Sequence, residues 1–207
     1  MTLLPVDPAS PDPDAIALAA AALAAGQLVV VPTDSVYGLA ADPSLPGAVS
    51  RLFEAKGRPR TLAIPVLVAS LAQVARLVRL DERARRAIGA HWPGALTLVL
   101  PRREGVTWDL GDRPGTLAVR MPDHPVALEL LTQAGPLAVT SANPTGEPTP
   151  DTAGEVRDLL GDAVSVYLDA GPSPGGTPST VLDLSGPEAV VLRAGALPAE
   201  DVRAALG

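Results

Sequence analysis

Three basic side chains, Lys56, Arg58 and Arg60, lie close together in the short stretch KGRPR, just after a helical pattern. Glycine and proline make such a stretch irregular, and closely spaced cations on an irregular loop are suited to holding phosphate groups. Lys56 is the single lysine in a chain with fifteen arginines, which suggests a role that arginine does not fill. The sequence contains neither GxxxxGK[ST] nor GxGxxG, so we expect no P-loop or Rossmann nucleotide site.

Lys56 also has a simpler explanation. As the last residue of a predicted helix, its charge would interact with the negative end of the helix dipole. In that position the side chain would be exposed, and its removal would hardly change stability, because an exposed helix-end charge contributes only about 0.3–1 kcal/mol.

A second set of polar side chains follows or flanks the ends of predicted strands. Its members are hydroxyl groups, one amide and two arginines: Thr33, Ser141, Asn143, Ser179, Thr180, Arg120 and Arg193. In α/β proteins the ends of neighbouring strands commonly meet at one edge of the sheet and form the binding site there. These side chains would then make a polar pocket for an anionic ligand that carries a hydroxyl group.

The elements that must position these residues alternate along the chain. Strands are indicated by short apolar runs, and helices by caps and by apolar residues spaced three and four apart. The predicted strands are residues 28–31, 64–69, 95–100, 116–121, 137–140, 165–168, 180–184 and 189–192. The predicted helices are residues 13–25, 46–56, 71–78, 81–90, 122–133, 152–160 and 198–206. The alternation predicts one α/β or α+β domain over residues 1–207, with a mixed sheet.

Composition restricts the possible functions. The net charge is −7 and aromatic residues make up 2% of the chain, so neither a general basic field nor stacking platforms for nucleic-acid bases are present. The chain has no cysteine, which excludes disulfides and thiolate chemistry. We find no signal peptide and no apolar run long enough to span a bilayer, and we therefore expect a cytoplasmic protein.

Seven blocks of the sequence, taken together, resemble the threonylcarbamoyl-AMP synthase (YrdC-like) family. In chain order they are PTDSVYGLAAD, KGRP, WPGALTLVL, LAVRMPDHP, TSANPTG, PSTVLDL and VLRAG, and the resemblance covers about residues 15–195. The resemblance implies a twisted mixed sheet with helices around a deep, positively charged cavity, a fold akin to that of dihydroxybutanone phosphate synthase. It also implies synthesis of threonylcarbamoyl-AMP and pyrophosphate from L-threonine, bicarbonate or CO2, and ATP. Partner proteins would then transfer the threonylcarbamoyl group to tRNA.

The resemblance also implies roles for individual residues. Lys56, Arg58, Ser141 and Asn143 match the characteristic quartet of the family. Threonine would bind against Thr33, Arg120, Ser141, Ser179 and Thr180, with Arg120 on its carboxylate. The nucleotide would bind against Lys56, Arg58, Thr116, Asn143 and Arg193, with Mg²⁺ held mainly by the triphosphate and by no dedicated protein site.

One stretch departs from the family pattern. After KGRP the family carries a polar residue, then lysine or asparagine, then Pro-Leu, whereas this chain has the residues RTLAI over 60–64. A basic or amide side chain is therefore missing near Leu62, and Arg60 is the residue we expect to replace its charge at the triphosphate. The segment 169–179 holds three glycines and three prolines, and we expect it to act as a lid or, alternatively, as a passive linker.

Two other classes of function remain open. A double-stranded RNA or tRNA-binding module is disfavoured as the sole function by the acidic composition, although the arginine-rich run 76–86 is a possible RNA-facing patch. A carbamoyl-adenylating domain of hydrogenase maturation would be expected to carry cysteine-rich zinc segments, which this chain lacks. Asp34 is a possible base or metal ligand, or the residue of an Asx turn. His91 and His124 are expected to be structural.

Overall fold

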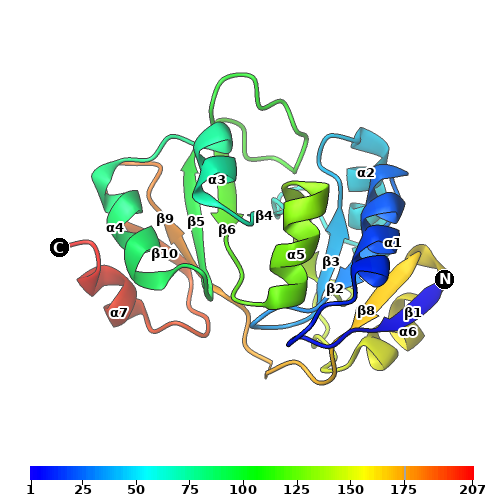
Figure 1. Cartoon of the computed structure of the whole chain (residues 1–207). Coiled ribbons are helices and arrows are strands. Elements are labelled where there is room, and N and C mark those ends of the chain that lie inside the picture. Colours follow the sequence, from blue (N-terminus) through cyan, green and yellow to red (C-terminus); the bar gives the residue numbers. More distant parts are fainter. Residues whose placement is uncertain (175) are drawn as a thin grey trace.

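The computed structural model describes residues 1–174 and 176–207. Within these residues ten strands form one sheet, in the order β1-β8-β2-β3-β7-β4-β6-β5-β9-β10 (Figure 1). The strands are β1 (Thr2–Pro5), β2 (Val29–Val31), β3 (Gly38–Ala41), β4 (Val66–Leu67), β5 (Leu96–Pro101), β6 (Thr116–Arg120), β7 (Leu137–Ser141), β8 (Val166–Asp169), β9 (Thr180–Asp183) and β10 (Val190–Arg193). The pairs β1–β8, β2–β8, β4–β6 and β5–β9 are parallel and the others are antiparallel. The predicted single-domain α/β fold with a mixed sheet is confirmed.

Local signals in the sequence place the helices. They are α1 (Pro13–Ala24), α2 (Pro46–Lys56), α3 (Leu71–Leu77), α4 (Glu82–His91), α5 (Pro125–Ala134), α6 (Ala153–Leu160), the 3-10 turn η1 (Gly161–Ala163) and α7 (Ala199–Ala204). The side chains of Asp12, Ser70 and Asp81 each accept a hydrogen bond from a backbone N–H in the first turn of the following helix. Thr152 and Glu155 form a complete capping box at α6. These caps are short-range interactions, which is why the sequence predicts them.

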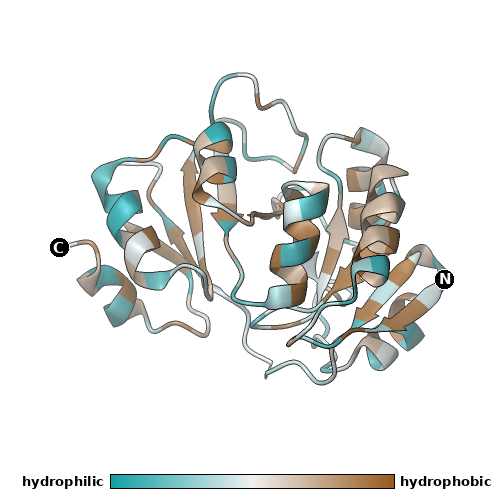
Figure 2. Cartoon of the chain, viewed as in Figure 1, coloured by the Kyte–Doolittle hydropathy of each residue, from teal (hydrophilic) through white to brown (hydrophobic). Residues whose placement is uncertain are grey.

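The two faces of the sheet bury two separate apolar clusters. Along β2, Val29 and Val31 belong to a cluster with α1 and α5, whereas Leu28 and Val30 belong to a larger cluster with α2 and α6. Successive side chains of a strand point to opposite faces, so this apolar run fills both layers at once. Helices α1 and α5 lie side by side over one face (Figure 1). Figure 2 shows apolar residues concentrated in the strands and polar residues on the outer turns of helices such as α4.

The region after β2 differs from the prediction. No strand was predicted over residues 36–41, but residues 38–41 form β3, which pairs antiparallel with β2 and with β7. A Cβ atom on Gly38 would lie 2.6 Å from Cγ1 of Val139, so only glycine permits this approach to β7. Strand β4 is shorter than the predicted 64–69, and its start after Pro65 agrees with the missing N–H of that residue. Strand β1, which pairs with β8, was not predicted.

No helix among the described residues combines the length and the apolar character needed to cross a membrane.

Candidate active site

Two adjoining cavities open where strand ends converge. The first has a volume of about 140 Å³ and is lined by polar residues that include Thr33, Ser35, Arg120, Ser141 and Ser179. The second has a volume of about 370 Å³ and is more apolar, with Leu110, Leu117, Val181 and Leu192 beside Thr116. Arg58, Pro65, Thr97 and Arg193 line both cavities, so the two spaces meet at these residues.

The strand register brings distant segments together at the first cavity. Gly38 pairs with Ser141, so the loop before β3 lies beside the end of β7. Leu96 pairs with Thr180 across parallel strands, which places Thr97 next to the start of β9. The hydroxyl oxygens of Thr97 and Ser179 are 2.8 Å apart. The predicted convergence of polar strand ends is therefore present for Thr33, Arg120, Ser141, Ser179 and Arg193.

Arg120 is 5% exposed and is held by three protein acceptors. Its Nη2 lies 2.6 Å from Oδ1 of Asp34, its Nη1 donates to Oγ of Ser35 at 3.0 Å, and its Nε donates to the carbonyl of Gly94 at 2.9 Å. A guanidinium has five N–H groups, so two remain for a ligand. Asp34 therefore has a definite role as the carboxylate partner that orients Arg120.

The hydroxyl groups near Arg120 form a directed chain. Thr33 donates to the carbonyl of Val36 at 2.6 Å, so its oxygen must accept from Ser35, whose Oγ lies 3.2 Å away. The backbone N–H of Ser35 also donates to Thr33 Oγ1, at 3.2 Å. The proton and both lone pairs of Thr33 are thus used within the loop. The oxygen of Ser35, which sequence reasoning missed, keeps one lone pair free for a ligand.

Lys56 is 2% exposed, so the prediction of an exposed helix-end charge is wrong. Its Nζ donates to the carbonyl of Ser141 at 2.5 Å, to the carbonyl of Asn143, and to Oδ1 of Asn143 at 3.3 Å. The backbone N–H of Thr145 donates to the carbonyl of Lys56 at 2.8 Å. The loop after β7 therefore covers the end of α2 and buries the ammonium group. Burial first, and then the charge of Arg58, lower the pKa of Lys56 to about 8.

Arg58 and Arg193 bring further positive charge to the junction of the cavities. Arg58 donates to the carbonyls of Leu62 at 2.7 Å and Ala63 at 3.1 Å, and Arg193 donates to the carbonyl of Ser179 at 2.7 Å. Neither forms an ion pair with a carboxylate among the described residues. Burial lowers the pKa of both guanidinium groups, with smaller contributions from Arg193 on Arg58 and from Arg120 on Arg193. A group of mutually repelling cations of this kind favours an anionic ligand.

Four residues expected at the ligands line neither cavity: Lys56, described above, and Arg60, Asn143 and Thr180. Arg60 pairs with Asp109 and lies over the ring of Phe53, 5.0 Å from its centroid. The hydroxyl of Thr180 donates to the carbonyl of Leu197 at 2.5 Å and is fully buried. The amide of Asn143 bonds to the carbonyls of Pro144 and Glu147, which stabilises its own loop. These placements correct the expected direct contacts of Arg60 and Thr180.

Sequence reasoning missed three further residues that line the first cavity: Tyr37, Thr97 and Thr140. Thr97 could have been identified from the sequence, because it is the one hydroxyl residue within the apolar run ALTLVL of its strand. The hydroxyl of Tyr37 donates to the carbonyl of Gly171 at 2.6 Å and accepts from the N–H of Ala170 at 3.1 Å. Burial raises its pKa to about 12, so it stays protonated and holds the start of segment 169–179. Gly175 of the proposed lid lies outside the described residues.

A single glycine allows the end of β10 to approach the start of β9. A Cβ atom on Gly195 would lie 2.3 Å from the carbonyl oxygen of Pro178 and 2.4 Å from the carbonyl carbon of Ser179. We expect Gly195→Ala to push the two backbones apart and to move Arg193 off Ser179, at a stability loss of about 1–3 kcal/mol. Binding of an anionic ligand should weaken by at least about tenfold, as the loss of one charged contact predicts. Gly186→Ala is the matched control, since no atom lies within 4 Å of its added Cβ. Equal ligand affinity of the two variants would contradict this role.

Cationic side chains facing two adjoining cavities at converging strand ends define the class: an α/β protein with a cavity for small anionic ligands. The family model that describes Sua5, YciO and YrdC proteins, under the description "Telomere recombination", matches residues 21–195. The chain belongs to this family, which confirms the resemblance found in the seven sequence blocks.

Three similar proteins illustrate the relationship. A Mycobacterium tuberculosis relative is 49% identical over 193 residues, which cover 93% of this chain and 89% of the relative. The Bacillus subtilis protein named threonylcarbamoyl-AMP synthase is 38% identical over 195 residues, covering 93% of this chain and 56% of that protein. The crystal structure of Pyrococcus abyssi Sua5 with L-threonine matches with a TM-score of 0.94 and 37% identity, covering 100% of this chain and 61% of that one. The chain thus spans about three fifths of the longer relatives.

Proposed function

We propose that this protein is an L-threonylcarbamoyladenylate synthase, a nucleotidyltransferase that forms threonylcarbamoyl-AMP and pyrophosphate from L-threonine, bicarbonate or CO2, and ATP. The observation that carries the proposal is the pair of adjoining cavities with Arg58 and Arg193 at their junction. The reaction joins an amino acid to a nucleotide through one carboxyl group, so it needs two ligand spaces that meet at cationic side chains. The relatives named above support the same activity.

Threonine occupies the first cavity in this proposal. Its carboxylate accepts from the two free N–H groups of Arg120, and its amine or hydroxyl donates to the free lone pair of Ser35. Thr97 and Ser179 supply further hydroxyl groups on the side that faces the second cavity. The threonine amine combines with bicarbonate to give a carbamate and water.

ATP occupies the second cavity, with its nucleoside against the apolar wall and its phosphates toward Arg58 and Arg193. A carbamate oxygen then attacks the α-phosphorus, the P–O bond to the β-phosphate breaks, and pyrophosphate leaves. The protein provides orientation and neutralises charge, so no protein nucleophile is needed. Mg²⁺ enters with the triphosphate and supplies additional charge neutralisation there. Lys56 shapes the loop of Ser141 and Asn143 from behind the cavity.

The product would serve tRNA modification through separate transfer proteins in the cytoplasm. The arginine run of α3 and α4 is better explained as a protein surface than as an RNA site. Arg79 pairs with Glu104, Arg85 with Glu82, and Arg83 donates to three backbone carbonyls after β9. The acidic composition also disfavours a function limited to RNA binding.

Mass spectrometry of purified protein incubated with threonine, bicarbonate and ATP tests the activity directly. We expect threonylcarbamoyl-AMP and an equal amount of pyrophosphate, and neither when bicarbonate is removed. Valine should be a poor substrate, because hydroxyl partners such as Ser35 and Thr97 would remain unpaired against it. Sites that form a hydrogen bond with a substrate hydroxyl can discriminate against analogues without it by about 10⁴-fold in kcat/KM. Equal turnover of valine and threonine would contradict the placement of the amino acid, and no adenylate at all would contradict the proposed function.

A further inference from the structure

The loop between β5 and β6, residues 102–115, rises above the sheet and forms part of the second cavity (Figure 1). Two backbone hydrogen bonds fasten it to the segment after α2. The N–H of Asp112 donates to the carbonyl of Arg60 at 2.9 Å, and the N–H of Ile64 donates to the carbonyl of Leu110 at 2.8 Å. Gly111 makes the approach possible, because its φ is +112° and a Cβ there would lie 2.6 Å from the oxygen of Arg60.

This contact places Arg113 and Leu62 on the wall of the same cavity. Leu62 is 46% exposed and carries no charge. Arg60 is absent from the lining of this cavity; it pairs with Asp109 and lies over the ring of Phe53. Residues 56–64 therefore contribute one cation to the lining, Arg58.

The four arginines that line the second cavity differ in what holds them. Arg58 and Arg193 donate to backbone carbonyls, and Arg102 donates to the carbonyls of Thr116 at 3.3 Å and Trp108 at 3.0 Å. The side chain of Arg113 makes no hydrogen bond or ion pair with any other described residue. All five of its N–H groups are available to a ligand.

From these contacts we infer that Arg113 is a further substrate-binding residue, which binds a phosphate group of the nucleoside triphosphate. The inference rests on the proposed function for the identity of the ligand. The residue belongs to a loop that docks on residues 60–64, so its position depends in part on the tertiary contact at Gly111. Its length and planar fork suit a phosphate at the rim of the cavity.

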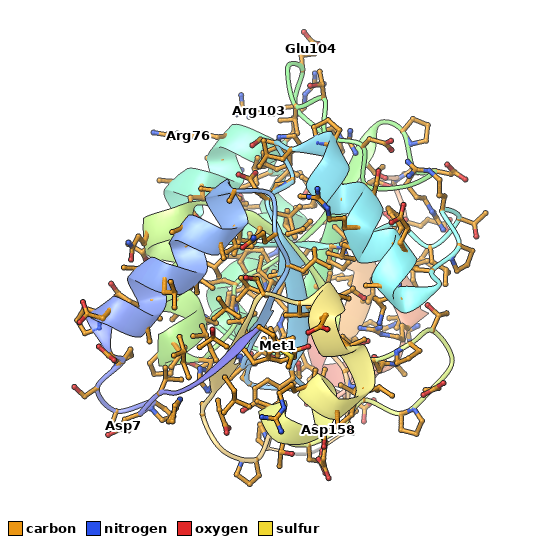
Figure 3. All side chains as sticks on the ribbon, turned by 90° about the vertical axis from the view of Figure 1, so that its right-hand side faces the viewer. Met1, Asp7, Arg76, Arg103, Glu104 and Asp158 are labelled. Carbon is orange, nitrogen blue, oxygen red and sulfur yellow. The ribbon has the colours of Figure 1, made fainter. Side chains whose placement is uncertain are left out.

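Calorimetry tests this role by measuring ligand binding to wild-type protein, Arg113→Ala and Arg113→Lys. The ligands are a non-hydrolysable ATP analogue, adenosine and inorganic triphosphate. We expect the alanine variant to bind the ATP analogue and triphosphate about tenfold more weakly, as a lost charge-assisted contact predicts, while adenosine binding stays unchanged. The lysine variant should recover part of the loss. Arg103→Ala is the matched control on the same loop, since Arg103 and Glu104 lie at its outer end (Figure 3).

Two outcomes would overturn the inference. Unchanged binding of triphosphate in Arg113→Ala would show that the side chain does not reach a phosphate. If Arg113→Ala weakened the binding of adenosine and of the ATP analogue equally, the side chain of Arg113 would contact the nucleoside instead. Because the measurement is of binding, it separates this inference from the proposed function: wild-type protein that binds ATP and forms no adenylate would contradict only the latter.

Discussion

Lys56→Ala is expected to abolish adenylate formation and to destabilise the protein at the same time. The substitution leaves the carbonyl of Asn143 without its Lys56 donor, at a cost of about 1–3 kcal/mol, whereas the carbonyl of Ser141 still accepts from the N–H of Asn143 at 3.0 Å. Relief of the buried charge offsets part of this cost, so we expect a net loss of about 1 kcal/mol, or about 2–4 °C in Tm. Thermal unfolding and product assays on the same samples measure both effects. Glu54→Ala, an exposed change on α2, should alter neither.

The lowered pKa of Lys56 predicts a pH dependence of stability that tests its burial. Because its pKa in the folded protein is about 8 and its ordinary value is 10.5, the folded state loses this proton before the unfolded state does. Between these two values the unfolded chain binds more protons, so the contribution of Lys56 to stability rises with pH. Below about pH 8 both states are charged and the contribution is constant. The difference in stability between wild type and Lys56→Met should therefore grow in favour of wild type from pH 8 to 10.5. A difference independent of pH would contradict this assignment.

Removal of the Arg120 guanidinium is expected to have the second large effect. In Arg120→Met the carboxylate of Asp34, whose side chain is 15% exposed, loses its partner. Breaking a buried pair in this way costs about 3–5 kcal/mol, and threonine should bind at least about 100-fold more weakly because its carboxylate loses two charged hydrogen bonds. Equilibrium unfolding and the KM for threonine separate the two consequences.

The double variant Arg120→Met/Asp34→Asn distinguishes folding from substrate binding. Removing the unpaired charge should recover most of the lost stability, whereas threonine binding should stay weak. Asp34→Asn alone keeps the guanidinium but loosens it, so we expect a higher KM for threonine with a smaller change in stability. Recovery of threonine binding in the double variant would mean that Arg120 only supports the fold and does not hold the substrate.

Short-range physics made much of this protein predictable from its sequence. Helix caps such as Thr152 with Glu155 join residues three apart, and the apolar spacing of α2 identifies the face that packs on the sheet. The polar residues after strand ends were predicted to converge, because strand ends of an α/β sheet meet at shared edges. Five of those seven residues line the first cavity, as does Arg58, which was predicted separately. Fold class and the main cationic side chains therefore needed no tertiary information.

The tertiary structure alone decided which charges are free and which are engaged. Lys56 meets its acceptors 85 and 87 residues along the chain, and Arg120 meets Asp34 at a separation of 86. Arg60 pairs with Asp109, which lies 49 residues further along the chain. Sequence spacing predicts contacts within a helix turn or along one strand, but it carries no distance between side chains on separate elements. A buried charge is defined by those distances, and they arise only when the sheet is assembled.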